Sequence, residues 1–221
     1  MTFTAQFEEA LTFATRLHAT QTRKGSDIPY IAHLLGVASI ALDHGANEEE
    51  AIAALLHDAV EDQGGEKTLN RIRRRFGSTV ADIVWGCSDT DKVPKPPWRK
   101  RKEAYIAHVA CASPSIQLVS ASDKLHNARA ILSDYRCVGD KLWVRFTGGK
   151  EGTLWYYRAL VEAFQRSGMN RQLVADLDLT VADIERLASK HAGRFPFRMI
   201  YVFAAGLIVG ELIERLYRRA R

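Results

Sequence analysis

The stretch from Leu55 to Asp62, with the sequence LLHDAVED, most constrains what this chain can fold into. An α-helix turns about 100° per residue, so His57 lies on the same helix face as Glu61, four residues later. Asp58 and Asp62 have the same spacing. Carboxylates held this close repel one another, and burying them without a cation is costly. The alternative is a solvated acidic helix end, but the apolar residues before the cluster favour burial and therefore a bound cation.

Two more distant side chains could reach a cation bound at this helix. His33 lies in an otherwise apolar segment, where a lone histidine is more often a core residue than a ligand. Asp123 follows the mostly apolar residues 116–121 and is expected to be drawn inward, where a carboxylate needs a cation or dense hydrogen bonding. The alternative for Asp123 is an ion pair with Lys124 or Arg129.

A single metal centre accounts for these residues better than four separate structural explanations. Two imidazoles and two carboxylates suit manganese, iron or zinc. Open positions on such an ion would hold water and a phosphate oxygen. The expected ligand set is His33, His57, Asp58 and Asp123.

Hydrophobic periodicity predicts that the chain is helical almost throughout. Asn47 and Glu50 resemble a capping box at the start of the helix that carries the acidic cluster, and a Gly-Gly pair at residues 64–65 interrupts the pattern. Prolines within residues 93–97 exclude a regular helix there. The expected helices cover residues 7–18, 29–44, 48–62, 69–76, 79–85, 98 onward, 114–131, 154–164 and 172–189. No strand-rich stretch or internal repeat is apparent, so the predicted fold class is all-α.

Composition limits the function classes only loosely. A length of 221 residues, with 47% hydrophobic and 26% charged residues, indicates one globular domain with an ample core. The formal net charge of +5 favours anionic partners, including phosphorylated small molecules. The three cysteines form no metal-like pair, and the N-terminus has no signal-peptide pattern, so a cytoplasmic protein is expected.

The C-terminal tail differs from the rest of the chain in composition. Residues 199–210 form an uninterrupted apolar run, which is shorter than the roughly 18–20 residues that a bilayer span needs. Arginines flank this run on both sides and could anchor it at a membrane surface. We expect a domain at residues 1–190 and a tail at residues 191–221, whose apolar helix packs on the domain or on a partner. The alternative is peripheral membrane contact through residues 199–213.

The order of His33, His57-Asp58 and Asp123 resembles the H…HD…D signature of the HD-domain phosphohydrolases. Wider matches narrow this resemblance to the hydrolase domain of the RelA/SpoT family, whose members degrade the alarmone (p)ppGpp. Those matches are Arg23-Lys24-Gly25, Pro29–His33, Leu55–Asp62 and Ala121–Arg129. The resemblance covers about residues 3–188 and leaves no room for the synthetase and regulatory domains of the long members. It therefore implies a stand-alone small alarmone hydrolase.

The resemblance also implies a set of site residues within an all-helical HD-domain bundle. One manganese ion per chain would be held by His33, His57, Asp58 and Asp123. Glu61 and Asp62 match the acidic pair that activates or positions the attacking water. The implied substrate contacts are Arg23 and Lys24 near the nucleotide, Asn127 at the substrate, Lys100 and Arg101 at the pyrophosphate, and Tyr156 as an aromatic or hydroxyl contact.

The implied reaction removes the 3′-pyrophosphate of guanosine tetra- or pentaphosphate and yields GDP or GTP. A metal would supply hydroxide near neutral pH, and Glu61 with Asp62 would accept or orient the proton of the water. One alternative is an HD phosphohydrolase that acts on another phosphorylated nucleotide, such as NADPH, because pocket shape would decide the substrate. Another is a non-catalytic nucleotide-sensing module, which would have no need of the acidic pair.

Other partner classes are less well supported. The arginine-rich residues 71–75 do not predict nucleic-acid binding, because such a run usually forms a solvated helix face. No nucleic-acid partner is therefore expected. The chain has no glycine-rich phosphate loop, so ATP-driven chemistry is not indicated. The sequence does not set the oligomeric state, and a homo-oligomer stays open.

Overall fold

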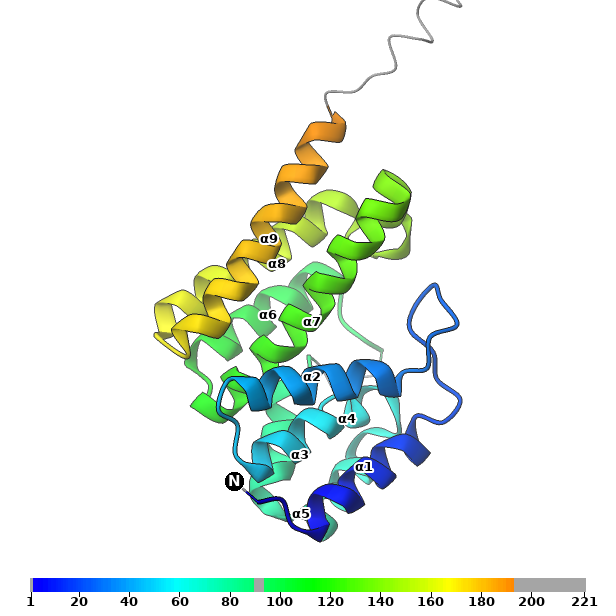
Figure 1. The fold of residues 1–221 in the computed structure, drawn as a ribbon, viewed down its shortest axis with the longest axis vertical. Helices are drawn as coiled ribbons and strands as arrows, with labels where there is room; N and C mark the ends of the chain where they lie inside the picture. The colour runs from blue at the N-terminus through cyan, green and yellow to red at the C-terminus, as the bar shows by residue number, and fades with distance from the viewer. Residues whose placement is uncertain (1, 90–93, 193–221) are drawn as a thin grey trace, which may run out of the picture. The chain divides into compact units, whose positions relative to one another are not determined.

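The computed structural model describes residues 2–89 and 94–192, and helices dominate both ranges (Figure 1). The α-helices are α1 (Ala5–Leu17), α2 (Ile31–Asp43), α3 (Glu48–Leu56), α4 (Ala59–Asp62), α5 (Gly65–Cys87), α6 (Trp98–Cys111), α7 (Pro114–Val138), α8 (Gly149–Ser167) and α9 (Arg171–Ala192). A 3₁₀ helix, η1 (Gly139–Arg145), joins α7 to α8. Within the described ranges the only extended pairing is an isolated bridge between Thr22 and Pro29, so the predicted all-α class is confirmed.

The helix expected over residues 48–62 is interrupted in its middle. It begins with the predicted capping box, in which Asn47 Oδ1 accepts from the Glu50 amide at 2.9 Å and Glu50 Oε2 accepts from the Asn47 amide at 2.8 Å. His57 and Asp58 then form a junction between α3 and α4. An unbroken helix would point these consecutive side chains about 100° apart. At the junction Asp58 departs from regular helical angles, with φ of −93° and ψ of −4°, and Nε2 of His57 lies 3.1 Å from Oδ2 of Asp58.

The two helices expected at residues 69–76 and 79–85 are joined into one element, α5, by a kink at Gly77. The φ angle of Gly77 is 92°, a left-handed conformation that favours glycine. Phe76 and Val80 are both buried on either side of the kink. The sequence therefore places the irregularity correctly, but the apolar face continues across it and keeps the two segments packed as one element.

The centre of residues 1–185 is formed by α2, α3 and α7. Helix α2 packs against α3 and α7, and α3 also packs against α1 and α5. In the view of Figure 1, α1, α3 and α5 lie below α2, whereas α6, α7 and α8 lie above it. Leu34, Ile52 and Leu125 have no exposed surface and contribute to this core from its three central helices. These same helices carry the predicted metal ligands.

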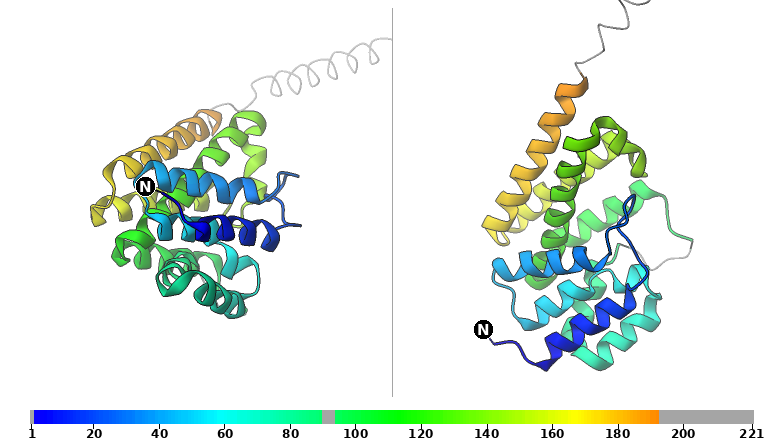
Figure 2. Two further views of the ribbon diagram at one scale, coloured as in Figure 1. Left: turned by 60° about the horizontal axis from the view of Figure 1, so that its bottom comes forward. Right: turned by 45° about the vertical axis from the view of Figure 1, so that its right-hand side comes forward.

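The segment between α1 and α2 projects beyond the ends of both helices (Figure 2). Besides the bridge between Thr22 and Pro29, the amide of Arg23 donates to the carbonyl of Ile28 at 2.9 Å. These pairings give a non-helical segment a defined backbone. It carries Arg23 and Lys24, for which the family resemblance implies a place near the nucleotide.

The chain divides into two compact units, residues 1–185 and residues 186–221. Of the second unit the structure describes residues 186–192, which are the end of α9. The expected C-terminal apolar helix and the segment 199–213 with its membrane contact lie outside the described residues. No helix in the described ranges combines the length and apolar character needed to cross a membrane.

Candidate active site

The four predicted metal ligands converge from three parts of the chain. His33 comes from α2 and Asp123 from α7, and the other two come from the junction between α3 and α4. The Nε2 atom of His57 lies 3.1 Å from Oδ2 of Asp58 and 3.5 Å from Oδ1 of Asp123. The Nε2 atom of His33 lies 3.4 Å and 3.3 Å from the same two oxygens. The two histidines are 1% and 3% exposed, so these donor atoms face one another inside the protein.

The hydrogen bonding of the two imidazoles fits a divalent cation. The Nε2 atoms of His33 and His57 are buried and have no hydrogen-bond partner among the described residues. The Nδ1 atom of His57 lies 2.8 Å from the carbonyl of Ala54, which can only accept, so Nδ1 carries the proton in the neutral ring. That arrangement leaves the lone pair on Nε2. His33, His57 and Asp58 form a group that could hold a divalent metal ion, and Oδ1 of Asp123 lies within 3.5 Å of both imidazoles.

The carboxylates shift the charge state of the neighbouring histidine when no metal is present. Burial opposes protonation of His57, but Asp58 and Asp123 outweigh it and hold the pKa of this imidazole well above its usual range. A proton and a divalent cation therefore compete for the same place between the two acids.

Asp123 uses its two carboxylate oxygens differently. Oδ2 lies 2.6 Å from the Nζ of Lys124, which is the ion pair considered as the alternative to metal binding. Oδ1 faces the two histidines and also accepts a 2.5 Å hydrogen bond from Nδ2 of Asn127. Oδ1 of Asn127 in turn accepts from Nη2 of Arg23 at 2.7 Å. The ion pair and the inward-facing oxygen thus coexist, and Arg129 instead pairs with Asp176 at 3.6 Å.

The acidic pair lies on α4, directly after the His-Asp junction. Oδ2 of Asp62 accepts a 2.7 Å hydrogen bond from Nε2 of Gln21, whose own oxygen accepts from Gln63 at 2.6 Å. Oε1 of Glu61 lies 2.8 Å from Nζ of Lys95, which sits in the proline-rich segment. Burial and the nearby Asp58 carboxylate raise the pKa of Asp62. A raised pKa makes Asp62 a better proton acceptor than an ordinary aspartate.

A pocket of about 860 Å³ opens beside this cluster. It is lined by both members of the acidic pair, by cationic side chains from several elements, and by aromatic side chains. Its volume is within the usual range for small-molecule and cofactor sites. Of the predicted acidic and substrate-contacting residues, those at its wall are Arg23, Lys24, Glu61, Asp62, Arg101, Asn127 and Tyr156.

Lys100 does not line this pocket, contrary to what its predicted role requires. It lines a neighbouring cleft of about 460 Å³, with Arg101 between the two. Residues three and four apart lie on the same face of a helix, and the face of α6 that meets the pocket carries Trp98, Arg101 and Lys102. Lys102 was not predicted as a substrate contact, because a run of basic residues does not indicate which of them face the pocket.

A partly buried ion-pair cluster positions two basic side chains of α6. Asp89 contacts the guanidinium of Arg101 and lies 2.8 Å from Nζ of Lys102. Burial alone would raise the pKa of Asp89, but Lys102 and Arg101 outweigh it and lower the pKa. Burial and Lys124 lower the pKa of Lys102. The cluster therefore brings several cationic groups to one wall of the pocket.

Tyr156 is buried at the pocket, and its hydroxyl has no hydrogen-bond partner among the described residues. Its ring lies 4.9 Å from Nζ of Lys102, measured to the ring centroid. A buried hydroxyl without a partner is unfavourable unless a ligand or water completes it. Tyr156 is thus available for a hydroxyl contact with a substrate.

Two residues beside the candidate ligands were not anticipated from the sequence. The hydroxyl of Tyr30 donates a 2.5 Å hydrogen bond to Oδ2 of Asp58. The Nδ1 atom of His126 lies 2.9 Å from Nδ1 of His33. Each lies three residues from a predicted ligand, Tyr30 from His33 and His126 from Asp123, which is the spacing of neighbours on a helix face. This spacing is the feature of the sequence from which both contacts could have been predicted. Burial, with His33 and Arg23 adding to it, lowers the pKa of His126 to about 4.

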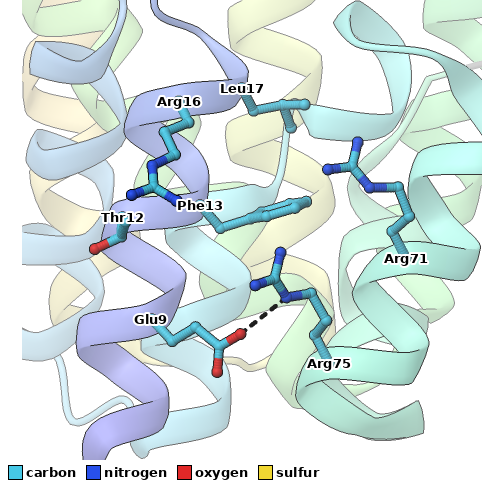
Figure 3. Close-up of a pocket in the computed structure, with 7 residues that line it drawn as sticks. All are labelled: Glu9, Thr12, Phe13, Arg16, Leu17, Arg71 and Arg75. Atoms are coloured by element: carbon cyan, nitrogen blue, oxygen red, sulfur yellow. Dashed lines mark hydrogen bonds and ion pairs between the residues drawn. The ribbon is translucent and has the colours of Figure 1, made fainter.

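A separate pocket of about 570 Å³ lies between α1 and α5 and contains none of the predicted site residues (Figure 3). The guanidinium carbons of Arg71 and Arg75 lie 4.9 Å and 5.0 Å from the ring centroid of Phe13. Arg75 also pairs with Glu9 at 2.8 Å, as Figure 3 shows. Outside this pocket, Arg73 pairs with Asp82 at 3.0 Å. Much of the arginine-rich run thus has partners within the protein.

Comparison with known proteins finds relatives named as guanosine-3′,5′-bis(diphosphate) 3′-pyrophosphohydrolases and others named as GTP pyrophosphokinases. The chain is 38% identical to the Danio rerio guanosine-3′,5′-bis(diphosphate) 3′-pyrophosphohydrolase MESH1 over 129 residues, which are 57% of this chain and 69% of the relative. It is 40% identical to the Xenopus tropicalis MESH1 over 55% of this chain and 66% of the relative. The Escherichia coli bifunctional (p)ppGpp synthase/hydrolase SpoT is 31% identical over 57% of this chain and 18% of its own length.

Solved structures share the fold. One, described as "A metazoan ortholog of SpoT hydrolyzes ppGpp and plays a role in starvation responses", has a TM-score of 0.68 at 24% identity and covers 81% of this chain and 96% of that chain. The crystal structure of lmo0812 from Listeria monocytogenes has a TM-score of 0.60 at 28% identity, over 71% of this chain and 99% of that chain. The HD domain family matches residues 10–153, a span that includes every candidate metal ligand. The chain therefore belongs to the HD-domain family, and enzymes named guanosine-3′,5′-bis(diphosphate) 3′-pyrophosphohydrolase are among its relatives.

Proposed function

We propose that this protein is a metal-dependent phosphohydrolase that removes the 3′-pyrophosphate of (p)ppGpp, giving GDP or GTP and pyrophosphate. The observation that carries the proposal is the buried cluster of His33, His57, Asp58 and Asp123, which lies beside a pocket with an acidic pair and several cations. The relatives named for this reaction support the choice of substrate.

The proposed metal ligands are the two buried imidazoles and the two carboxylates that face them. A mixed set of nitrogen and oxygen donors suits Mn²⁺, and one such ion per chain is proposed. When bound, the ion would lower the pKa of a coordinated water and polarise a phosphate oxygen. The unpaired Nε2 atoms of His33 and His57 support this assignment, because a bound cation would satisfy both.

Glu61 and Asp62 are proposed to handle the proton of the attacking water. The water oxygen bonds to the phosphorus nearest the ribose 3′ oxygen, and the bond from that phosphorus to the ribose oxygen breaks. A carboxylate of the pair accepts the proton of the water and can return it to the ribose oxygen. Gln21 holds one oxygen of Asp62, and this fixes the direction in which the other oxygen points.

The cationic side chains of the pocket are proposed to bind the phosphates. Arg101 and Lys102 are held on one wall by Asp89, and Arg23 is held on another by Asn127. Their charges would offset the negative charge on the 3′-pyrophosphate group as water attacks its phosphorus. Lys24 and the free hydroxyl of Tyr156 are further proposed contacts, whereas Lys100 lies outside this pocket.

A substrate panel tests the proposal against the two alternatives. The full chain, freed of metal and then supplied with Mn²⁺, is incubated with ppGpp, pppGpp, NADPH and GTP, with a chelator-treated sample as control. We expect pyrophosphate release from the alarmones in the Mn²⁺ sample alone. Phosphate release from NADPH at a higher rate would favour the second substrate class. Tight ppGpp binding without turnover would favour the sensing module.

The remaining proposals concern placement and assembly. The division into a domain at residues 1–190 and a tail at 191–221 stays a prediction from composition. A cytoplasmic location is supported by the exposed free thiols of Cys111 and Cys137, which suit a reducing compartment. The tail as a membrane contact, and a homo-oligomer, stay open proposals that fractionation and light scattering would test.

A further inference from the structure

We propose that His126 is a positioning residue for the metal site, which selects the tautomer and orientation of His33. The inference rests on the proposed metal centre and concerns how one of its ligands is prepared. The two Nδ1 atoms lie 2.9 Å apart, and the ring centroids are 4.8 Å apart with the planes tilted by 59°. This is hydrogen-bonding distance between two imidazoles, so one nitrogen must donate and the other accept.

The environment of His33 decides which nitrogen donates. Its Nε2 atom is buried, has no hydrogen-bond partner among the described residues, and faces the oxygens of Asp58 and Asp123. For Nε2 to offer a lone pair to a cation, the single proton of the neutral ring must sit on Nδ1. Among the residues that the structure describes, the atom placed to accept that proton is Nδ1 of His126. His126 must therefore be neutral, with its own proton on Nε2.

The packing of α2 and α7 holds the acceptor in place. His33 and Gly36 lie three residues apart on α2, opposite Asp123 and His126, which lie three residues apart on α7. A Cβ atom at Gly36 would collide with Cδ2 and Nε2 of the His126 ring. Glycine is unfavourable inside a helix, so its presence there needs a packing reason. The reason at Gly36 is room for the His126 ring.

The tautomers of the two imidazoles proposed to bind the metal are therefore fixed by different kinds of partner. His57 donates to the backbone carbonyl of Ala54, a partner that is part of the helix and that substitution does not remove. His33 depends on a side chain from another helix. Outer partners of this kind change metal affinity by about 10- to 100-fold when they are lost. We therefore expect His33 to be the more easily perturbed ligand of the two.

Mn²⁺ titration of the metal-free full chain tests this role with a matched pair of variants. His126→Phe keeps a ring but removes the acceptor, whereas His126→Asn places an amide oxygen close to the position of Nδ1. We expect His126→Phe to weaken Mn²⁺ binding by about 10- to 100-fold and His126→Asn to bind nearly as tightly as the wild type. A purely structural role would lower the unfolding midpoint of both variants without separating their Mn²⁺ affinities. Wild-type affinity in His126→Phe would overturn the proposal.

If His126→Phe does not fold, a second pair of variants tests the same role. Gly36→Ala should displace the ring and weaken Mn²⁺ binding in the wild type, but it should have a smaller effect in His126→Asn, whose side chain is shorter. Equal losses in both backgrounds would overturn the proposal. The proposed function is tested separately by ppGpp turnover. If Mn²⁺ binds through His33 but ppGpp is not hydrolysed, the function fails while the role of His126 stands. If no divalent ion binds the wild type, both fail.

Discussion

Tyr30 donates a 2.5 Å hydrogen bond to the same carboxylate oxygen of Asp58 that faces both candidate metal-binding imidazoles. The tyrosine ring is itself held between His18, on which it stacks at 5.2 Å, and His33, which it meets at 5.4 Å, both measured between centroids. We expect Tyr30→Phe to keep this packing and to lose only the hydrogen bond. Mn²⁺ affinity should then fall by about 10-fold or more, as measured by titration of the metal-free protein. Unchanged affinity would mean that the Asp58 carboxylate is oriented without Tyr30.

Removal of Asp58 should be damaging, because this proposed ligand, like Asp123, places one oxygen beside both histidines. Asp58→Ala should abolish metal retention, measured by elemental analysis after gel filtration, and turnover with it. Circular dichroism would establish that the variant is folded. Full activity of either the variant or the wild type in metal-depleted buffer would contradict the site.

Substitution of Glu61 or Asp62 should lower the rate of hydrolysis without changing metal binding. Glu61→Gln and Asp62→Asn keep the size of the side chain and its hydrogen bonding while removing the proton acceptor. Each should lower kcat by about 10²- to 10⁴-fold with metal content unchanged, since general bases typically contribute this much. A variant that turns over at the wild-type rate would remove its residue from the mechanism. Loss of metal together with activity would show that the pair acts as ligands instead.

Lys102 and Lys100 form a matched pair on α6, one lining the large pocket and the other outside it. Lys102→Ala should raise KM for ppGpp by about 10-fold or more, because a partly buried cation near phosphate is screened less by solvent than an exposed one. Lys100→Ala, which removes the same charge from an exposed position, should change KM little at physiological salt. Equal effects on KM would mean that the overall field of the helix, rather than the pocket contact, attracts the substrate.

Metal binding should strengthen as pH rises. In the metal-free protein Asp58 and Asp123 overcome the effect of burial and hold the pKa of His57 well above its usual range, so this ring keeps its proton to a higher pH than an ordinary histidine does. A divalent ion must displace that proton. Affinity should therefore increase as the pH rises above about 6 and level off only once metal-free His57 is deprotonated. Calorimetry in buffers of different ionisation enthalpy would measure the released proton. Affinity independent of pH over this range would exclude the competition.

Much of the candidate site follows from local reasoning about helices and charge. The acidic cluster at residues 57–62 and Asp123 were each expected to be buried charges that need a counterion. In the fold, Nε2 of His57 lies beside an oxygen of Asp58 and an oxygen of Asp123. The capping box at Asn47 and the irregularity near Gly77 were also evident, because both depend on residues close in sequence. The roles of the individual residues as ligands and proton acceptors stay predictions.

What the sequence did not reveal depends on contacts between distant elements. The contact of His126 with His33 joins α7 to α2 across 93 positions of the chain. The choice of Lys102 over Lys100 depends on the rotation of α6 about its axis, which a run of basic residues does not determine. Neither proline nor glycine lies at residues 57–58, so the sequence gives no sign that the helix is interrupted there. Packing of the surrounding helices decides all three.

The single-turn helix α4 stands between two irregular points of the backbone, the junction at Asp58 and the left-handed Gly64 with φ of 106°. Glu61 and Asp62 lie on this short segment, which packs against α5 through the buried residues Ala59 and Val60. Substitutions in α5 beneath α4 would therefore shift Glu61 and Asp62 while His33 and Asp123, on α2 and α7, kept their positions. In a chain built this way, cation choice and water activation can drift apart over evolution, each adjusted by substitutions that leave the other intact.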